Sequence, residues 1–225
     1  LDRVIKEDIE NDVSEKHFVS EVARVRQHLS MVFHRYIADT TKQGIKVWLN
    51  ESPVDAWDPF CSNFKATQNV PEDSNSDLKR VVKVKGFILP HRDKFDPRDK
   101  VRSQKLHQAA AGPAGWNAQQ GFYLYRNRRL IIPGDWLGLG PGANGWKNEE
   151  HFKLARIRVD IPNSMDQEWQ IDVKKSTAIA PPALRRWLTG LAKSVREKAK
   201  EVYAFRGGRA NPRRRRGEGH ARPWV

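Results

Sequence analysis

Two stretches of this sequence, 79–90 and 152–161, alternate apolar and polar side chains with a period of two. That period is the signature of β-strands that bury one face and expose the other. A third stretch, 121–132, is typical of a hairpin, because two β-rich runs flank the polar turn Arg126-Asn127-Arg128-Arg129. A chain with several half-buried strands must cover their apolar faces with another layer.

Helical patterns supply that layer. After Pro181-Pro182, apolar residues recur at steps of three and four from Leu184 to Val202, which predicts an amphipathic helix that begins at Pro182. Similar spacing predicts a helix that begins at Glu21 and ends near Thr40 or Gly44, and the stretch 96–112 is typical of a surface helix. Together these patterns predict an α+β fold, a mostly antiparallel sheet with helices on one side.

The chain divides into three parts by pattern. Residues 1–78 are predicted to hold a helix and a short hairpin near 44–54, and their polar end, 62–79, is interpreted as a loop and hinge. Residues 79–204 are predicted to form the main α+β domain, and residues 205–225 a disordered arginine-rich tail.

Composition excludes some classes of protein. No apolar run approaches the roughly 20 residues that a membrane helix needs. The single cysteine, Cys61, cannot form an internal disulfide or a cysteine-based metal site. We therefore expect a soluble, cytoplasmic protein without membrane contact, and the first residue, Leu1, is interpreted as a sign of a truncated fragment.

The net charge of +14 is unevenly distributed. Residues 205–225 contain seven arginines and one glutamate, which gives that segment +6. The run Arg213, Arg214, Arg215 and Arg216 predicts an arm that binds phosphates or an acidic partner. The alternative is a solvated tail with only non-specific affinity.

The stretch Trp169–Ser176 ends in two adjacent lysines. Ile171 and Val173 alternate with polar neighbours, which predicts a short strand that hands over to a loop at Lys174 and Lys175. A cation at the end of a rigid strand can reach an anionic group.

Two other motifs give weaker evidence of a binding site. His28 and His34 are poor partners for a metal ion because they are not four residues apart on one helical face, so we expect a packing role and no metal site. The glycine-rich stretch 138–145 lacks the Lys-Ser/Thr of a P-loop, and we interpret it as a connector.

Five stretches of the sequence carry a resemblance to a known family. They are 28–36, 58–60, 86–91, 121–131 and 169–176. Together they resemble the GHKL ATP-binding proteins, the class of histidine kinases, gyrase B, heat-shock chaperones and MutL. The resemblance covers roughly residues 20–203 and concerns the transducer domain, the part that follows the nucleotide fold. It implies an α+β unit with a left-handed βαβ crossover.

The resemblance also implies a function. A transducer lysine in this family contacts the γ-phosphate of ATP and stabilises the charge that develops in hydrolysis. Lys174 or Lys175 would take this catalytic role here, with Lys153 as a further candidate. ATP and Mg²⁺ would be held by an upstream nucleotide-binding domain, because this chain lacks the family's nucleotide motifs and is expected to bind no cofactor alone. A homodimer, and DNA or another acidic molecule, are the further partners that the resemblance leaves open.

The alternative is a nucleic-acid-binding module without catalysis. It rests on the net charge, on the tail arginines, and on the basic and aromatic hairpin that carries Arg126, Arg128 and Arg129.

Overall fold

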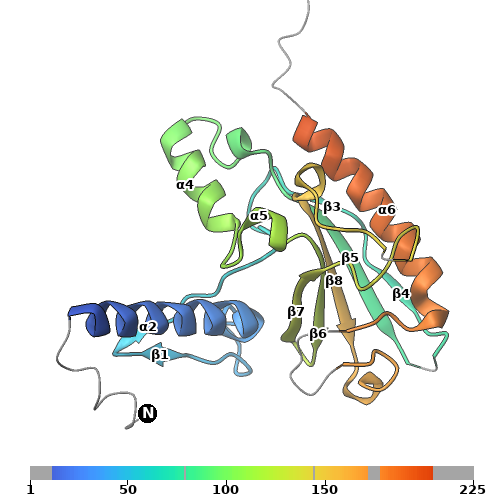
Figure 1. The fold of residues 1–225 in the computed structure, drawn as a ribbon, viewed down its shortest axis with the longest axis horizontal. Coiled ribbons are helices and arrows are strands. Elements are labelled where there is room, and N and C mark those ends of the chain that lie inside the picture. Colours follow the sequence, from blue (N-terminus) through green and yellow to red (C-terminus); the bar gives the residue numbers. More distant parts are fainter. Residues whose placement is uncertain (1–11, 79, 144, 172–177, 205–225) are drawn as a thin grey trace, which may run out of the picture.

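The computed structural model describes residues 12–78, 80–143, 145–171 and 178–204 (Figure 1). A six-stranded sheet, in the order β3-β5-β8-β6-β7 with β4 also paired to β5, forms the centre of the molecule. Its strands are β3 (Gln68–Asn69), β4 (Asp73–Asn75), β5 (Val82–Ile88), β6 (Gly121–Arg126), β7 (Arg129–Asp135) and β8 (Ala155–Ile161). The helices are α2 (Asp12–Val32), α3 (His34–Ile37), α4 (Lys100–Ala110), α5 (Gly115–Ala118) and α6 (Pro182–Ala204), with 3-10 turns η1 (Arg92–Lys94), η2 (Glu150–Phe152) and η3 (Asn163–Met165).

Most strand pairs are antiparallel, and the predicted α+β class is confirmed. The exception is the parallel pair of β6 and β8. These two strands are linked through β7 and the connector 136–154, whose one regular element is the 3-10 turn η2. The described strands therefore contain no βαβ unit, and the left-handed crossover that the resemblance implies is not found in this part of the chain.

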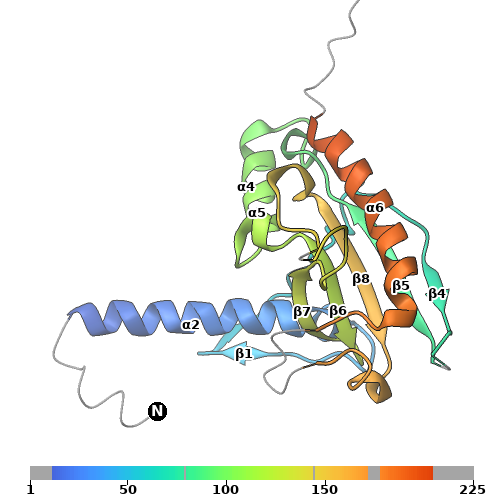
Figure 2. The same cartoon turned by 45° about the vertical axis from the view of Figure 1, so that its right-hand side comes forward.

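Helix α6 covers one face of the sheet (Figures 1 and 2). Its stripe Leu184, Leu188, Ala192, Val195 and Ala199 is buried, which confirms the amphipathic helix predicted after Pro181. Gly86 lets the helix come close, because a Cβ at this position would lie 2.6 Å from Cγ2 of Val195.

The opposite face carries aromatic side chains that also need a cover. Phe60 stacks on Phe87 with ring centroids 4.5 Å apart, and it meets the edge of Tyr123 at 5.4 Å. His34, from α3, packs against Tyr125 at 5.6 Å. Helical elements therefore contact both faces of the sheet, not the one side that the sequence pattern suggested.

Helix α2 extends away from the sheet, with the strand pair β1 (Trp48–Leu49) and β2 (Ser52–Pro53) beside it (Figures 1 and 2). Arg26 donates to the carbonyls of Leu49 and Pro53, at 2.8 and 2.7 Å, and so holds this hairpin against the helix. The predicted helix and hairpin are both present, although the strands are only two residues long.

The stretch 62–79, interpreted above as a hinge, contributes two strands to the central sheet. β3 and β4 both pair with β5. Because Phe60 and Cys61 belong to the same core as β5 and β8, the chain does not form a separate unit that ends at residue 78. None of the described helices has the length and apolar character needed to cross a bilayer.

The strand predicted over 169–173 is wrong for its described part. Trp169, Gln170 and Ile171 form a turn, with backbone N–H groups donating to the carbonyls of Met165, Gln167 and Asp166. Gln170 adopts a positive φ of 45°, which a strand does not allow. Trp169 is fully buried, so its indole anchors the turn in the core.

Candidate anion-binding site

A pocket of about 460 Å³ lies where the β6–β7 hairpin meets α3. Three of the residues that line it come from the hairpin and the others from the α2–α3 region, the segment before β1, and η3. They are Arg126, Asn127 and Arg129, with Phe33, Tyr36, Ile45 and Asn163. We call this the hairpin pocket.

The local sequence explains the hairpin. Asn127 and Arg128 form its two-residue turn with φ values of 46° and 67°, as a type I′ turn requires. Asparagine accepts this conformation readily, and the turn sets Arg126 opposite Arg129 in the strand register. The Tyr36 hydroxyl donates to the Asn127 carbonyl and ties the turn to α3.

The three predicted hairpin arginines have different surroundings. Arg126 forms an ion pair with Asp166, which fixes η3 beside the hairpin. Arg128 pairs with Asp39 at 2.7 Å, donates to the Arg35 carbonyl, and lies over the Tyr36 ring at 4.7 Å. Its hydrogen bond helps to hold the pKa of Asp39 below the ordinary value, after the stronger effect of Thr41.

Of the three hairpin arginines, Arg129 is the one that can pair with a bound anion. Its guanidinium lies over the Phe33 ring, 5.4 Å from the centroid, and it has no carboxylate partner among the described residues. No acidic side chain belongs to the pocket lining. The pocket can therefore accept an anion that pairs with Arg129, whose guanidinium is held over the Phe33 ring.

Lys174 and Lys175, the predicted catalytic residues, lie outside the described residues, as do Arg213, Arg214, Arg215 and Arg216. We call residues 170–178 the lysine segment. The residues that flank its lysines, 169–171 and 178–179, belong to the described part of the chain. The N–H of Ile179 donates to the Trp169 carbonyl at 2.9 Å, so the backbone enters and leaves the segment at one point.

That point is close to the hairpin pocket. The N–H of Ile171 donates to the Asp166 carbonyl at 3.1 Å, and the Asp166 side chain holds Arg126. Lys174 follows Ile171 by three residues, a contour length of about 10 Å.

Lys153, the further candidate, lies elsewhere. Its ammonium pairs with Glu150, holding the pKa of that carboxyl below the ordinary value, and lies over the Tyr203 ring at 5.3 Å. It precedes β8, whereas Asn163 of the pocket follows β8, so about 20 Å of strand separates them. Lys153 cannot share a site with the hairpin pocket.

The glycine-rich connector is explained by packing. A Cβ at Gly140 would lie 2.6 Å from the Trp146 ring, and Leu137 and Leu139 are buried. Arg185 donates to the Gly138 carbonyl at 2.6 Å, which pins the connector to α6. The interpretation as a connector fits this arrangement, in which Gly140 makes room for Trp146.

The two histidines differ in their surroundings. His34 is buried with Nε2 2.7 Å from the Tyr125 hydroxyl, whereas His28 is exposed. The described residues contain no cluster of side chains that could hold a metal ion.

Sequence reasoning missed the aromatic and apolar half of the pocket. Phe33 and Tyr36 fall within the predicted N-terminal helix, and Ile45 within the hairpin predicted near 44–54. Nothing in those patterns marks them as neighbours of Arg129, because the contact depends on how α3 packs on the sheet. Comparison with family models and with curated proteins finds no match to this chain.

Proposed function

We propose that this chain is the transducer portion of a GHKL-type ATP-binding protein, in which Lys174 or Lys175 senses the γ-phosphate. ATP and Mg²⁺ would be bound by an upstream nucleotide domain. Closure of that domain on the chain would bring a lysine to the phosphate, so hydrolysis would depend on conformation. The single buried cysteine fits a reducing compartment, and we place the protein in the cytoplasm.

One observation carries the proposal, the anchoring of the lysine segment. The Trp169–Ile179 hydrogen bond and the buried Trp169 indole fix both ends of the segment against the core. Preorganised groups stabilise a developing charge best, so the anchored flanking residues support a phosphate-contacting role for Lys174 or Lys175.

The hairpin pocket gives further support. Arg129 is available there, next to the Arg126–Asp166 pair that fixes the base of the lysine segment. A polyphosphate would be held better by Arg129 together with a lysine than by a lysine alone, and no acidic side chain lines the pocket.

Exposed apolar side chains of α2 and β1 offer a surface that another domain would cover. Phe18, Val19 and Val25 of α2 and Trp48 of β1 are large apolar side chains with about half or more of their surface exposed. Phe33 and Ile45, which line the hairpin pocket, lie near these two elements along the chain, since Phe33 directly follows α2 and Ile45 precedes β1 by three residues. An upstream nucleotide domain that covered the apolar side chains would also reach the pocket.

ATP turnover tests the proposal in the protein that carries the upstream domain. The variant is Lys174→Ala with Lys175→Ala, and the matched control is Lys198→Ala with Lys200→Ala, two exposed lysines of α6. We expect kcat to fall by about 10²-fold or more in the first variant, the size of the loss when one charge-stabilising group is removed.

The control variant should keep the turnover of the unmodified protein. Unchanged kcat in the Lys174 and Lys175 variant would contradict the proposal, provided that circular dichroism shows both variants to be folded. Single variants then identify which lysine contributes.

A second function, nucleic-acid binding without catalysis, is favoured by the pairing of Arg129 with an aromatic wall. The test is a salt titration of DNA binding, with and without residues 205–225. Binding that disappears with the tail would indicate a non-specific arm. Binding that survives, with a salt slope that falls by about one unit in Arg129→Gln, would place DNA on the hairpin pocket.

A further inference from the structure

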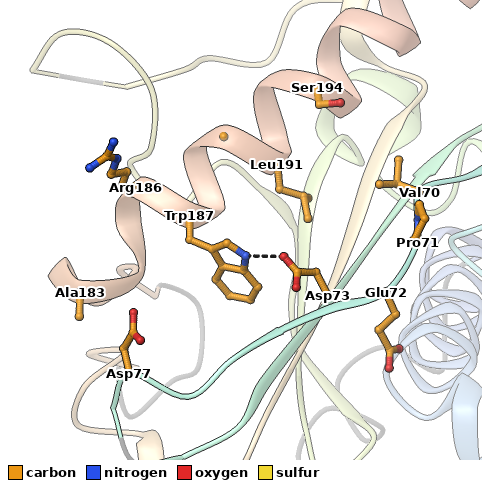
Figure 3. Close-up of a pocket in the computed structure, with 11 residues that line it drawn as sticks. Val70, Pro71, Glu72, Asp73, Asp77, Ala183, Arg186, Trp187, Leu191 and Ser194 are labelled. Atoms are coloured by element: carbon orange, nitrogen blue, oxygen red, sulfur yellow. Dashed lines mark hydrogen bonds between the residues drawn. The ribbon is translucent and has the colours of Figure 1, made fainter.

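A larger groove, of about 880 Å³, lies between α6 and the outer strands β3 and β4 (Figure 3). We call it the α6 groove. Apolar and acidic side chains share its walls. It is lined by Val70, Pro71, Glu72, Asp73 and Asp77 on the strand side and by Ala183, Arg186, Trp187, Gly190, Leu191 and Ser194 on α6.

Two carboxylates of the groove have no cationic partner among the described residues, Asp73 and Asp77. Asp73 accepts a hydrogen bond from the Trp187 indole N–H at 2.7 Å, and Asp77 accepts one from the Asn75 amide at 3.1 Å. Glu72 differs because it pairs with Arg158. The Arg186 side chain extends away from Asp73 (Figure 3).

An indole beside two carboxylates suits a guanidinium group. Carboxylates bind guanidinium through charge-assisted, often bidentate, hydrogen bonds, and a tryptophan face adds a cation–π contribution. The groove also has room, because a Cβ built on Gly190 would meet no atom within 4 Å. An acidic groove on a chain with a net charge of +14 selects a basic occupant.

The chain itself supplies such an occupant. Helix α6 lines the groove from Ala183 to Ser194 and ends at Ala204, where the arginine-rich residues 205–225 follow. Trp187 lies 17 residues before the end of the helix, a distance of about 26 Å along its axis. Arg213 is nine residues after Ala204 and can span about 30 Å when extended. A tail that turns back along α6 therefore reaches Asp73 with its first consecutive arginines.

We propose that the run Arg213–Arg216 docks in the α6 groove of its own chain, where its guanidinium groups pair with Asp73 and Asp77 beside Trp187. Weak ion pairs are sufficient for docking because the tail is tethered to the groove. A short flexible linker gives an effective concentration in the millimolar range. A docked tail cannot bind a polyanion at the same time. The groove would thus compete with phosphates for the arginines, independently of the function proposed above.

Limited trypsin digestion of the full chain at low salt tests this docking. The variant Asp73→Asn with Asp77→Asn removes the charges while leaving amide oxygens that accept hydrogen bonds. The matched control is Glu197→Gln with Glu201→Gln, two exposed carboxylates of α6 outside the groove lining. Mass spectrometry measures the rate of cleavage within 213–216.

We expect cleavage in the groove variant to be at least threefold faster than in the unmodified chain and in the control. About 1 M salt should remove the difference, because it screens exposed ion pairs. Gly190→Arg is a second variant that leaves both carboxylates in place and fills the groove with a like charge, and it should speed cleavage equally.

Equal cleavage rates in the groove variants and the control would overturn the proposal. Cross-linking in a mixture of isotopically light and heavy chains gives a second readout. Links between Asp73 or Asp77 and the tail within one chain support docking, whereas links only between different chains would overturn the intramolecular form and indicate exchange of tails in a dimer.

Discussion

Nε2 of His34 lies 2.7 Å from the hydroxyl oxygen of Tyr125, in the buried interface between α3 and β6. Burial lowers the pKa of His34 to about 4, with opposing effects from Asp58, which raises it, and Arg35, which lowers it. Burial also raises the pKa of Tyr125 well above the ordinary value. Both side chains are therefore neutral at pH 7, and their hydrogen bond joins two uncharged groups.

This pair makes the stability of the protein dependent on pH. The unfolded chain protonates His34 near its ordinary pKa of 6.5, whereas the folded protein does so only near 4. Between these values the unfolded state binds more protons, so the free energy of unfolding falls as the pH is lowered through this window. The contribution of His34 to that loss is about 3 kcal/mol between pH 7 and pH 4.

Urea denaturation at several pH values measures the effect. His34→Gln should be less dependent on pH than the unmodified chain in this window, while His28→Gln, at an exposed position, should keep the original dependence. His107 retains part of the slope in both, because burial lowers its pKa to about 4 as well. Parallel pH profiles for the unmodified chain and His34→Gln would contradict this prediction.

Arg156 is fully buried near the start of β8, and we expect its replacement to destabilise the protein severely. Its guanidinium donates to the carbonyls of Pro59 and Ala110 and lies 5.4 Å from the ring centroids of Trp57 and Trp116. Arg156→Ala removes this packing and leaves two carbonyls without donors. We expect a loss of about 3 kcal/mol or more in the free energy of unfolding, against less than about 1 kcal/mol for the exposed Arg102→Ala. A similar loss in both variants would refute the structural role of Arg156.

The residues around Arg156 show what the sequence could and could not predict. The strand β8 is evident from alternation, because the period of a half-buried strand is a local property. That Arg156 is buried is not evident, since an arginine in an alternating strand normally faces solvent. Its cover comes from Trp57 and Pro59, almost one hundred positions away, and only the packed structure brings them together.

The same distinction, between local patterns and contacts that only the packed structure creates, explains why the sequence does not predict the short strands or the turn at Trp169. β3 and β4 are polar, Gln68–Asn69 and Asp73–Asn75, so they carry no apolar signal and exist through backbone pairing with β5. The alternation from Trp169 to Ile171 is real but too brief to separate a strand from a turn around a buried indole. The hairpin was predictable because its turn and both runs are contiguous.

Gly86 and Val195 form a packing pair that a double-mutant cycle can test. Gly86→Ala places a Cβ 2.6 Å from Cγ2 of Val195 and 3.2 Å from Cβ of Val70, so the Val195 side chain, or α6 with it, must shift. We expect a loss of about 1–3 kcal/mol in the free energy of unfolding, the usual cost of overpacking. Val195→Ala alone should also destabilise by leaving a cavity.

The double variant distinguishes close packing from two independent defects. Removing the Val195 methyl groups makes space for the new Cβ, so the double variant should lose less than the sum of the single losses, with a coupling of at least about 0.5 kcal/mol. Strict additivity would show that Gly86 is not the residue that sets the approach of α6.

Arg128 and Arg129 are adjacent in the hairpin, and we expect opposite phenotypes. Arg128 is paired with Asp39 and with the Arg35 carbonyl, so Arg128→Gln should loosen the contact between the hairpin and α3 at a cost of about 1 kcal/mol. Within the described part of the chain, the Arg129 side chain contacts the Phe33 ring and has no carboxylate partner, so Arg129→Gln should leave stability within about 0.5 kcal/mol. Titration with inorganic triphosphate, followed by NMR shifts of the Asn127 and Arg129 amides, measures anion affinity. Arg129→Gln should weaken binding by about tenfold and Arg128→Gln by less than about threefold, since a lost charge-assisted contact costs about 1.5 kcal/mol or more. If the two variants lose affinity equally, the anion is attracted by net charge alone and the hairpin pocket is not its site.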